Sequence, residues 1–268
     1  MMSGKNAQDL FHREDTMQYL IHGDDFGKND SRTAANDRAL RRGLIHRTTL
    51  MVNMPATEEA TRLAAEGGYA ESVSFHLNLS EGRPLTDDVT KTALCKKDGM
   101  FCWAQTKRIQ SKCMSRGAVL AIRKECAAQM RRFRELGFTS EHIDSHDWVL
   151  FNLPVWKAVK PLLSQYGFET TRCACDNWIS LKSVPLRIYY RFMACQIGKR
   201  LRMEETWSGG LSSLRKAAAA GSITEKTRAE IMTHPDMADG EPADCLHGRC
   251  IPLEELADAV AEYGTPVT

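Results

Sequence analysis

The sequence predicts an α/β protein in which helices cover a parallel sheet. Short apolar stretches alternate along the chain with longer amphipathic ones, and this strand–helix order is typical of parallel sheets. The chain has 268 residues, of which 43% are hydrophobic, so it can form one large core. Single-domain α/β barrels often contain about 250 residues. The pattern alone leaves open whether the sheet stays open or closes into a barrel.

A single domain is expected over residues 19–268. Residues 1–18 are polar and charged, and they predict a flexible N-terminal lead-in. We find no linker or internal repeat that would divide the rest of the chain. The first predicted strand, 19–21, leads directly into two adjacent acids, Asp24 and Asp25.

Strands are predicted where short apolar runs end in polar or turn residues. The predicted strands cover 19–21, 48–52, 73–79, 139–146, 169–172 and 230–235. In the third of them, strict alternation places Phe75 and Leu77 on one face and His76 and Asn78 on the other. One face of this strand is therefore expected in the core and the other in a polar setting.

Helices are predicted where apolar residues recur at helical spacing between capping residues. The predicted helices cover 29–42, 57–65, 118–136, 153–166, 186–203, 211–220 and 252–262. Gly43, Gly137 and Gly167 fit the left-handed position that commonly follows a helix. The stretch 81–103 contains several helix breakers and predicts a long loop, of the kind that often forms a lid or a binding loop.

Charge and cysteine usage favour a soluble cytoplasmic protein. The net charge is only +2, from 36 basic and 34 acidic residues, so we expect neither nucleic acid nor a membrane as a partner. The chain has neither the apolar core of a signal peptide nor an apolar run of membrane-spanning length. Its nine cysteines lack a Cys-x-x-Cys pair and predict free thiols in a reducing compartment. We interpret Cys173-x-Cys175 as too tight for a zinc site, and His247 between Cys245 and Cys250 as part of a surface loop.

Polar residues collect where the predicted strands end. Asp24 and Asp25 come first, and two interpretations of them remain open: a solvated turn, or a site where a cation relieves the repulsion of adjacent carboxylates. The further residues of this kind are Asn53, His76, Asn78, His142, Asp144, His146, Arg172 and His234. Because the carboxyl ends of parallel strands meet at one edge of a sheet or barrel, the active site is expected there.

An open metal site can be assembled from these residues. His142, Asp144 and His146 alternate, so on a strand they would share one face. Asp25, His76 and His146 supply two imidazoles and one carboxylate, a common set that leaves positions for water and substrate. Asp24 would then be free to act as a base. Trp148 lies near the predicted site and is of the type that stacks on sugars, whereas His22 and His46 are interpreted as incidental and Trp156 as a core residue.

Five short motifs, in order along the chain, resemble those of the YdjC-like carbohydrate deacetylases, the family of chitooligosaccharide deacetylase. They are LIHGDDFG at 20–27, TTLMVN at 48–53, FHLNLSEGRPL at 75–85, HIDSH at 142–146 and THP at 233–235. The resemblance implies a deformed (β/α) TIM-like barrel related to the polysaccharide deacetylases. It also implies hydrolysis of an N-acetyl group on an amino sugar or a short chitooligosaccharide.

The resemblance further implies roles for the metal ligands, for Asp24 and His234, and for Arg172. Asp25, His76 and His146 would hold a divalent metal ion, Mg²⁺ or Zn²⁺, while Asp24 would be the general base and His234 the general acid. The residues expected in contact with substrate are Arg172, Asn53, Asn78 and Trp148, and those expected to orient the metal ligands are His142 and Asp144. The bound partner would be an N-acetylated sugar.

Two departures from the family pattern bear on the identity of the substrate more than on the metal site. Asp147-Trp148 stands where the family continues with further histidines, and His22-Gly23 replaces the usual Asn-Ala before the two aspartates. Hydrolysis of another amide or of a phosphoester, or sugar binding without turnover, therefore remain alternatives. The sequence also leaves open whether loop 81–103 closes over the substrate or completes the partner's site in a homodimer.

Overall fold

The structure of the chain is a computed structural model, and it describes residues 16–110, 112–173, 183–246 and 248–267. The predicted lead-in lies almost wholly outside the described residues, as do Cys175 and His247. Within the described ranges, no helix is both long enough and apolar enough to cross a membrane.

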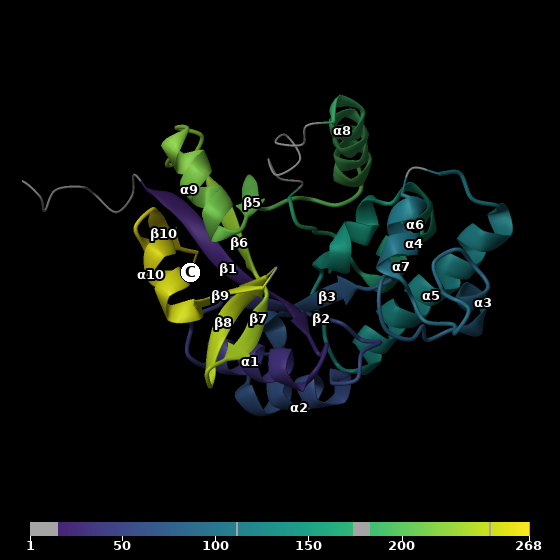
Figure 1. The fold of residues 1–268 in the computed structure, drawn as a ribbon, viewed down its shortest axis with the longest axis horizontal. Helices are drawn as coiled ribbons and strands as arrows, with labels where there is room; N and C mark the ends of the chain where they lie inside the picture. Colours follow the sequence, from purple (N-terminus) through teal and green to yellow (C-terminus); the bar gives the residue numbers. More distant parts are fainter. Residues whose placement is uncertain (1–15, 111, 174–182, 247, 268) are drawn as a thin grey trace, which may run out of the picture.

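A parallel sheet of seven strands forms the centre of the molecule (Figure 1). Its order is β4-β3-β2-β1-β6-β5, and β10 pairs with β1 as well. The strands are β1 (Met17–Phe26), β2 (Arg47–Leu50), β3 (Val73–Leu77), β4 (Ile143–Ser145), β5 (Trp207–Gly209), β6 (Arg228–Thr233) and β10 (Gly264–Pro266). Single-residue parallel bridges from Thr170 to His142 and to Arg202 extend the β4 edge. The sheet curls into a half-barrel, which is consistent with a TIM-like barrel.

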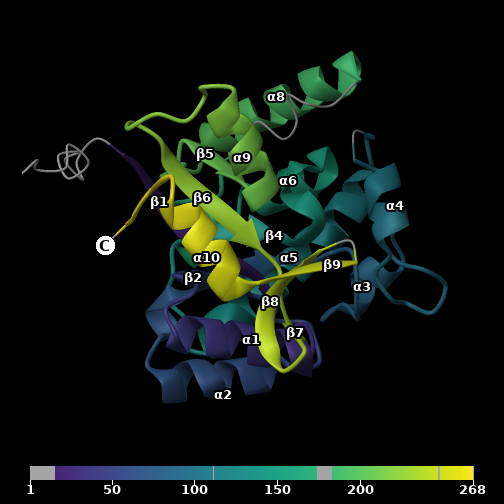
Figure 2. The same ribbon diagram turned by 60° about the vertical axis from the view of Figure 1, so that its left-hand side comes forward.

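Helices cover the outside of this half-barrel, as Figures 1 and 2 show from two directions. The α-helices are α1 (Asp30–Arg41), α2 (Thr57–Gly67), α3 (Asp87–Thr90), α4 (Trp103–Arg108), α5 (Arg116–Glu135), α6 (Leu153–Val159), α7 (Leu163–Tyr166), α8 (Val184–Gly198), α9 (Leu211–Ala219) and α10 (Leu253–Ala261). The part of the chain that the structure describes also contains the 3₁₀ turns η2 (Ala70–Ser72) and η3 (His146–Phe151). In both views α1 and α2 lie together, and α1 lies beside β7 (Pro235–Ala238) and β8 (Glu241–Leu246), two of the antiparallel strands of the ribbon that β9 (Arg249–Pro252) completes.

The outward faces of the strands are apolar because the helices pack on them. Phe75 and Leu77 of β3 are fully buried in the core that α5 and α6 cover. Tyr19 and Ile21 of β1, with Ile231 of β6, belong to a second core under α9 and α10. Burying a side chain of this size contributes about 1.5–3 kcal/mol to folding. The predicted alternation in β3 is therefore confirmed.

The inward faces of the same strands carry the polar side chains. On β1, His22 and Asp24 alternate with the core residues, and on β6 Glu230 alternates with Ala229 and Ile231. Because helices shield the outer surface and the interior is narrow, these inward polar groups are also buried. Buried charges are stable only when they are paired, so the inside of the half-barrel is expected to hold an ionic network.

Several predicted elements differ from the structure. The predicted strand 169–172 contributes only the bridges of Thr170, and the predicted helix 153–166 is divided into α6 and α7. The stretch 81–103 contains the short helix α3 and ends where α4 begins. β5 and β10 were not predicted, because strands of three residues give almost no periodic signal.

The β7–β8–β9 ribbon is also absent from the prediction, although the sequence carries a signal for it. Ala238 pairs with Glu241, and Asp239 and Gly240 between them both have positive φ, 51° and 83°. An Asp-Gly pair in this conformation is the typical two-residue hairpin turn.

One cysteine pair corrects the expectation of free thiols. Cys245 and Cys250 face each other across β8 and β9 with a Cα–Cα distance of 4.2 Å, and they form a disulfide. A direct cross-strand pairing brings two cysteines within bonding range, and their spacing in the sequence does not reveal it. The free thiols include Cys95, Cys102, Cys113, Cys126 and Cys195.

Candidate active site

Two adjacent aspartates end β1 and point to different places. Asp24 continues the inward face of the strand, whereas Asp25 has a φ of 67°, in the left-handed region. Aspartate tolerates this conformation better than most residues. The backbone change turns the Asp25 carboxylate away from Asp24, so each acid acquires its own partners.

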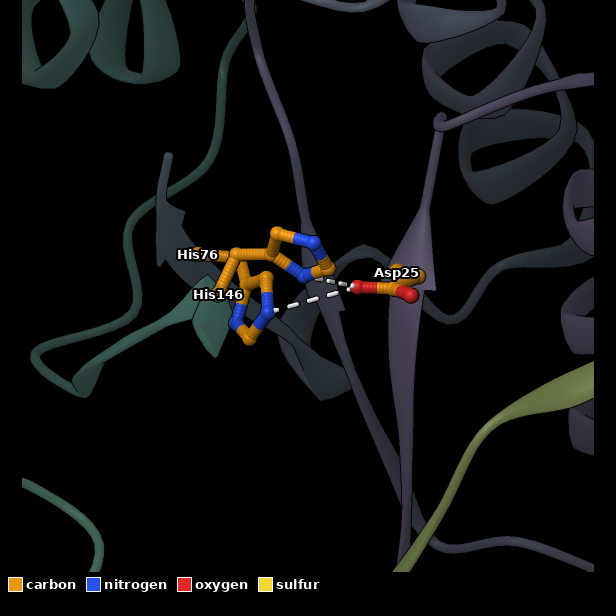
Figure 3. Close-up of side chains that lie close together, drawn as sticks. All are labelled: Asp25, His76 and His146. Atoms are coloured by element: carbon orange, nitrogen blue, oxygen red, sulfur yellow. Dashed lines mark ion pairs between the residues drawn. The ribbon is translucent and has the colours of Figure 1, made fainter. Parts of the chain in front are cut away.

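Asp25, His76 and His146 converge at the carboxyl ends of β1, β3 and β4 (Figure 3). Oδ1 of Asp25 lies 2.7 Å from Nδ1 of His146 and 3.5 Å from Nε2 of His76. The other oxygen, Oδ2, faces α1, where it accepts a hydrogen bond from Arg32 Nη1 at 2.9 Å and lies 3.5 Å from Lys28 Nζ. All three converging side chains are largely or fully buried.

The far nitrogen of each imidazole has a carboxylate partner. His76 Nδ1 lies 2.5 Å from Asp144 Oδ1, and His146 Nε2 lies 2.8 Å from Glu81 Oε1. Carboxylates behind metal-bound histidines commonly fix the tautomer and the orientation of the ring in this way.

The electrostatics of the metal-free protein follow from this pairing. Burial opposes ionisation of Asp25, but the two imidazoles hold its pKa well below the usual range. Burial likewise favours neutral imidazoles, yet Asp144 and Asp25 raise the pKa of His76 to about 10. Asp25 and Glu81 raise the pKa of His146 to about 9 against the same burial effect. Protons on the two imidazoles therefore supply the positive charge that a bound cation would supply.

The three residues fit a divalent metal ion. Their ligand atoms all lie within 4.8 Å of one another. Oδ1 of Asp25 is buried and has no partner with hydrogen-bond geometry among the described residues. Two nitrogens and one oxygen are a common donor set for an open site in which water and substrate complete the coordination.

Asp24 is held by an arginine inside the half-barrel. Arg172 Nη2 and Nη1 donate to Asp24 Oδ1 and Oδ2 at 2.6 Å and 2.9 Å, a bidentate pair. The same guanidinium lies 2.8 Å from Asp144 Oδ2 and donates to Glu230 Oε1 at 2.7 Å. Burial opposes ionisation of Asp24, but the Arg172 charge holds its pKa below the usual range. Asp24 is therefore an ionised carboxylate at neutral pH.

His234 lies across from Asp24, with 4.0 Å between Nε2 and Oδ2. It follows β6, and its backbone N–H donates to Asp244 of β8 at 2.7 Å. Burial lowers the pKa of His234, although Asp24 and Asp25 act in the opposite direction. The imidazole is thus mainly neutral near pH 7 and can accept a proton from a neighbour.

A cavity of about 410 Å³ opens over these groups. Asp24, His76, His146 and His234 line it, and so does Trp148. The remaining lining residues are Trp103, Thr106, Lys107, Gln110, Ser145, Asp147, Val149, Asn152, Arg172, Tyr190, Met232 and Leu246. Acidic, basic and aromatic groups therefore share a space large enough for a small ligand.

The structure distributes the other predicted site residues as follows. Arg172 lines the cavity, but its guanidinium forms ion pairs with the carboxylates of Asp24 and Glu230. Asn78 donates to Asn53 Oδ1 at 3.0 Å and to the carbonyl of Glu81 at 2.9 Å, so the two asparagines shape the loop after β3 and do not line the cavity. His142 lies deeper in the half-barrel, where its Nδ1 is 3.2 Å from Thr170 Oγ1.

Several residues of the site were missed by sequence reasoning. Glu81 and Lys28 form an ion pair at 2.6 Å beside His146, and His22 is buried rather than incidental. Glu230 could have been found as an acid between the apolar residues Ala229 and Ile231. His22 could have been found because it stands two positions before Asp24 on one strand, which puts both on the same face.

Comparisons with known proteins agree on one family. The family model described as YdjC-like protein matches residues 19–261. A carbohydrate deacetylase of Geobacillus stearothermophilus is 28% identical over 222 residues, which cover 82% of this chain and 80% of the relative. A carbohydrate deacetylase of Mus musculus is 27% identical over 252 residues, covering 85% and 80%. One from Clostridium beijerinckii is 33% identical over 151 residues, covering 56% and 58%.

A solved structure shares the fold. It is that of an Enterococcus faecalis V583 protein described as a cellobiose-phosphate cleavage protein, with a TM-score of 0.65 and 19% identity. The match covers 94% of this chain and 97% of that one.

Proposed function

Because the chain belongs to the YdjC-like family, we propose that it is a metal-dependent carbohydrate deacetylase. It would hydrolyse the N-acetyl group of an amino sugar or a short chitooligosaccharide, releasing acetate and a free amine. One observation carries this proposal: a carboxylate–imidazole set that suits a metal presents both of its imidazoles to the same cavity as a second, ionised carboxylate and a neutral histidine. The relatives named above as carbohydrate deacetylases support the same substrate class.

Asp25, His76 and His146 would hold the metal. When bound, the ion would supply Lewis-acid polarisation of the acetamide carbonyl and lower the pKa of the attacking water. Two imidazoles favour Zn²⁺ over Mg²⁺, because Mg²⁺ prefers oxygen ligands. Asp144 and Glu81 would keep the two rings in the orientation that presents the inner nitrogens.

Asp24 and His234 would move the protons. Asp24 takes a proton from the attacking water as the C–O bond forms. Because Arg172 keeps Asp24 a weak base, the carboxylate holds this proton only briefly, and His234 Nε2 at 4.0 Å is the next acceptor. His234 then gives the proton to the leaving amine as the C–N bond breaks. The second proton of the water leaves on the acetic acid, which ionises to acetate in solution.

The decisive experiment is a product assay on the purified protein. Acetate release is measured with a panel of N-acetylated mono- and oligosaccharides, and phosphate release with matched phosphoesters, after loading with Zn²⁺ or Mg²⁺. Acetate release that disappears in His76→Ala supports the proposal. Phosphate release, or metal binding without either product, would favour another hydrolase or a sugar-binding protein instead.

A further inference from the structure

The loop after β3 contacts His146 on the side of the ring that faces away from Asp25. Glu81 Oε1 lies 2.8 Å from His146 Nε2, and Asp147 Oδ2 lies 3.5 Å from the same nitrogen. Asp147 in turn accepts a hydrogen bond from Ser80 Oγ at 2.8 Å. Since the other ring nitrogen points to Asp25 (Figure 3), the direction of that nitrogen depends on where Ser80 and Glu81 lie.

Asn78 fixes the positions of Ser80 and Glu81. Its side chain is fully buried, and its Oδ1 accepts hydrogen bonds from the backbone N–H of Ser80 at 3.1 Å and of Glu81 at 3.3 Å. Its Nδ2 donates to the carbonyl of Glu81 at 2.9 Å. Asparagine side chains often stabilise a turn by binding the backbone that follows them. One amide group therefore determines how the chain leaves β3.

Helix α5 holds Asn78 in place. Gln129 accepts from the backbone N–H of Asn78 at 3.2 Å and donates to its carbonyl at 2.8 Å. Gln129 also donates to Glu125 Oε1 at 2.8 Å, and Glu125 accepts from the backbone N–H groups of Leu85 and Thr86 at 3.0 Å and 2.8 Å. Both α5 side chains are fully buried, so the loss of a partner would leave a polar group unsatisfied. The start of the loop is thus anchored to the core at two points.

We propose that Asn78 is a positioning residue for the predicted metal ligand His146. Through Ser80 and Glu81 it holds the carboxylates of Glu81 and Asp147 against the outer nitrogen of the ring, so the inner nitrogen stays directed toward the place of the ion. This role differs from the substrate contact that the sequence suggested for Asn78. The inference rests on the proposed metal-dependent function.

The first test measures metal affinity without turnover. Zn²⁺ is titrated into the metal-free protein in competition with a chromophoric chelator. In Asn78→Ala we expect the affinity to fall roughly 10–100-fold, the range typical when the support behind a metal-bound histidine is lost. Thr92→Val is the matched control, because it removes side-chain hydrogen bonds of the same loop that reach only Val89 and Leu94. Parent-like Zn²⁺ affinity in Asn78→Ala would refute the proposal.

Spectra of the Co²⁺-loaded protein separate a displaced ligand from a general loss of stability. The visible absorption bands of Co²⁺ depend on the geometry of its ligands, and geometry is what the proposal assigns to Asn78. We expect altered bands in Asn78→Ala and parent-like bands in Thr92→Val. Bands in Asn78→Ala that coincide with those of the parent would show that the ring keeps its place without Asn78.

Two milder variants test the same link if Asn78→Ala does not fold. Ser80→Ala removes the oxygen that binds Asp147, and Glu81→Gln keeps the size of the side chain beside His146 but removes its charge. Each should lower the Zn²⁺ affinity by roughly threefold to tenfold, the effect of weakening a single polar contact. Parent-like affinity in both variants would contradict the proposal.

Failure of this inference and failure of the proposed function give different results. A parent protein that binds Zn²⁺ but releases no acetate overturns only the proposed function. A parent that binds Zn²⁺ and releases acetate, with the same Zn²⁺ affinity and the same Co²⁺ bands in Asn78→Ala, overturns only the inference.

Discussion

Asp24 and Asp25 are consecutive in the chain, yet their carboxylates pair with different arginine and lysine side chains. Arg172 binds Asp24, whereas Lys28 and Arg32 flank the outer oxygen of Asp25. The left-handed backbone of Asp25 separates them, because the inward face of the strand ends at Asp24. At the scale of single residues, one carboxylate is available to a metal and the other to a proton.

This division predicts that two substitutions differ in their effect on metal binding. Asp24→Asn should keep the metal and lower kcat by about 10²–10⁴-fold, because a general base typically contributes that much. His76→Ala should lose the metal and, with it, activity. Metal content by mass spectrometry and acetate release separate the two cases. Asp30→Asn, which removes an exposed acid of α1, should change neither. Full activity in Asp24→Asn would show that the base is another group.

At the scale of elements, β1 packs so closely that a methyl group does not fit at Gly23. A Cβ there would lie 2.5 Å from Asn36 Oδ1 and 2.7 Å from Ile45 Cδ1. Gly23→Ala should therefore destabilise the fold by about 1–3 kcal/mol, measured by urea unfolding. Gly117→Ala in α5 is the control, since nothing lies within 4 Å of the added atom. Equal stability of both variants would mean that α1 yields easily to the larger side chain.

The turn after His146 is strained and forms part of the cavity wall. Asp147 and Trp148 have φ values of 51° and 58°, and left-handed backbone costs about 1–2 kcal/mol per residue. The hydrogen bond from Ser80 to Asp147, 2.8 Å long, and the edge contact of Trp148 with Phe151 help to hold the turn. Strain of this kind commonly marks a functional position.

If Trp148 stacks on the sugar, its removal should weaken binding more than turnover. Trp148→Ala should raise KM by about threefold to tenfold, in line with the roughly 0.5–1.5 kcal/mol of an aromatic contact, while kcat changes little. Trp148→Phe should restore most of the loss. Steady-state kinetics on the best sugar of the panel measure both. A KM that stays constant in Trp148→Ala would place the sugar elsewhere in the cavity.

The elements show what could be predicted and why. The long amphipathic α5 and the alternating strand β3 could be predicted, because each buries one face over many residues. β5 and β10 could not be predicted, because a strand of three residues is too short to show a periodic pattern of apolar residues. Each is recognised as a strand only by its pairing with β6 or β1. Polar residues at strand ends predicted where Asp24, His76, His146 and His234 come together around a cavity, because parallel strands bring those ends together.

The ionic network was beyond the reach of the sequence for a different reason. Arg172 was expected to contact substrate, but its hydrogen bonds to Asp24 and Glu230 join residues 148 and 58 positions apart. No local spacing encodes such pairings; they follow from the curvature of the sheet. His22 was interpreted as incidental for the same reason, although its position two residues before Asp24 indicates that both lie on the same face of β1.

At the scale of the whole molecule, a bound metal should stabilise the fold. A ligand at 100 times its Kd adds about 2.7 kcal/mol to the free energy of unfolding. For a chain of this size, that corresponds to a rise in Tm of roughly 5–10 °C. Differential scanning calorimetry with and without a chelator measures it, and His76→Ala should abolish the rise. An equal rise in that variant would place the stabilising ion outside the predicted site.

Metal uptake should also release protons. His76 and His146 have pKa values raised to about 10 and about 9, so both imidazoles are protonated at pH 7 in the metal-free protein. The metal binds only the neutral rings, so two protons leave at pH 7, and the apparent affinity should increase as the pH rises toward 9. Calorimetric titrations in buffers of different ionisation enthalpy count the protons. A heat that is the same in every buffer would contradict the pairing.

The order of the site residues along the chain has one further consequence. All three ligands of the predicted metal position lie within the first 146 residues, whereas Arg172, Glu230 and His234 come from the remainder. The residues that would hold the ion therefore all come before Arg172, Glu230 and His234 in the sequence, and the proposed base Asp24 lies among them. Mutations accumulating after His146 can alter turnover while the ion stays in place, so descendants of such a protein can lose catalysis in a single step and still bind metal.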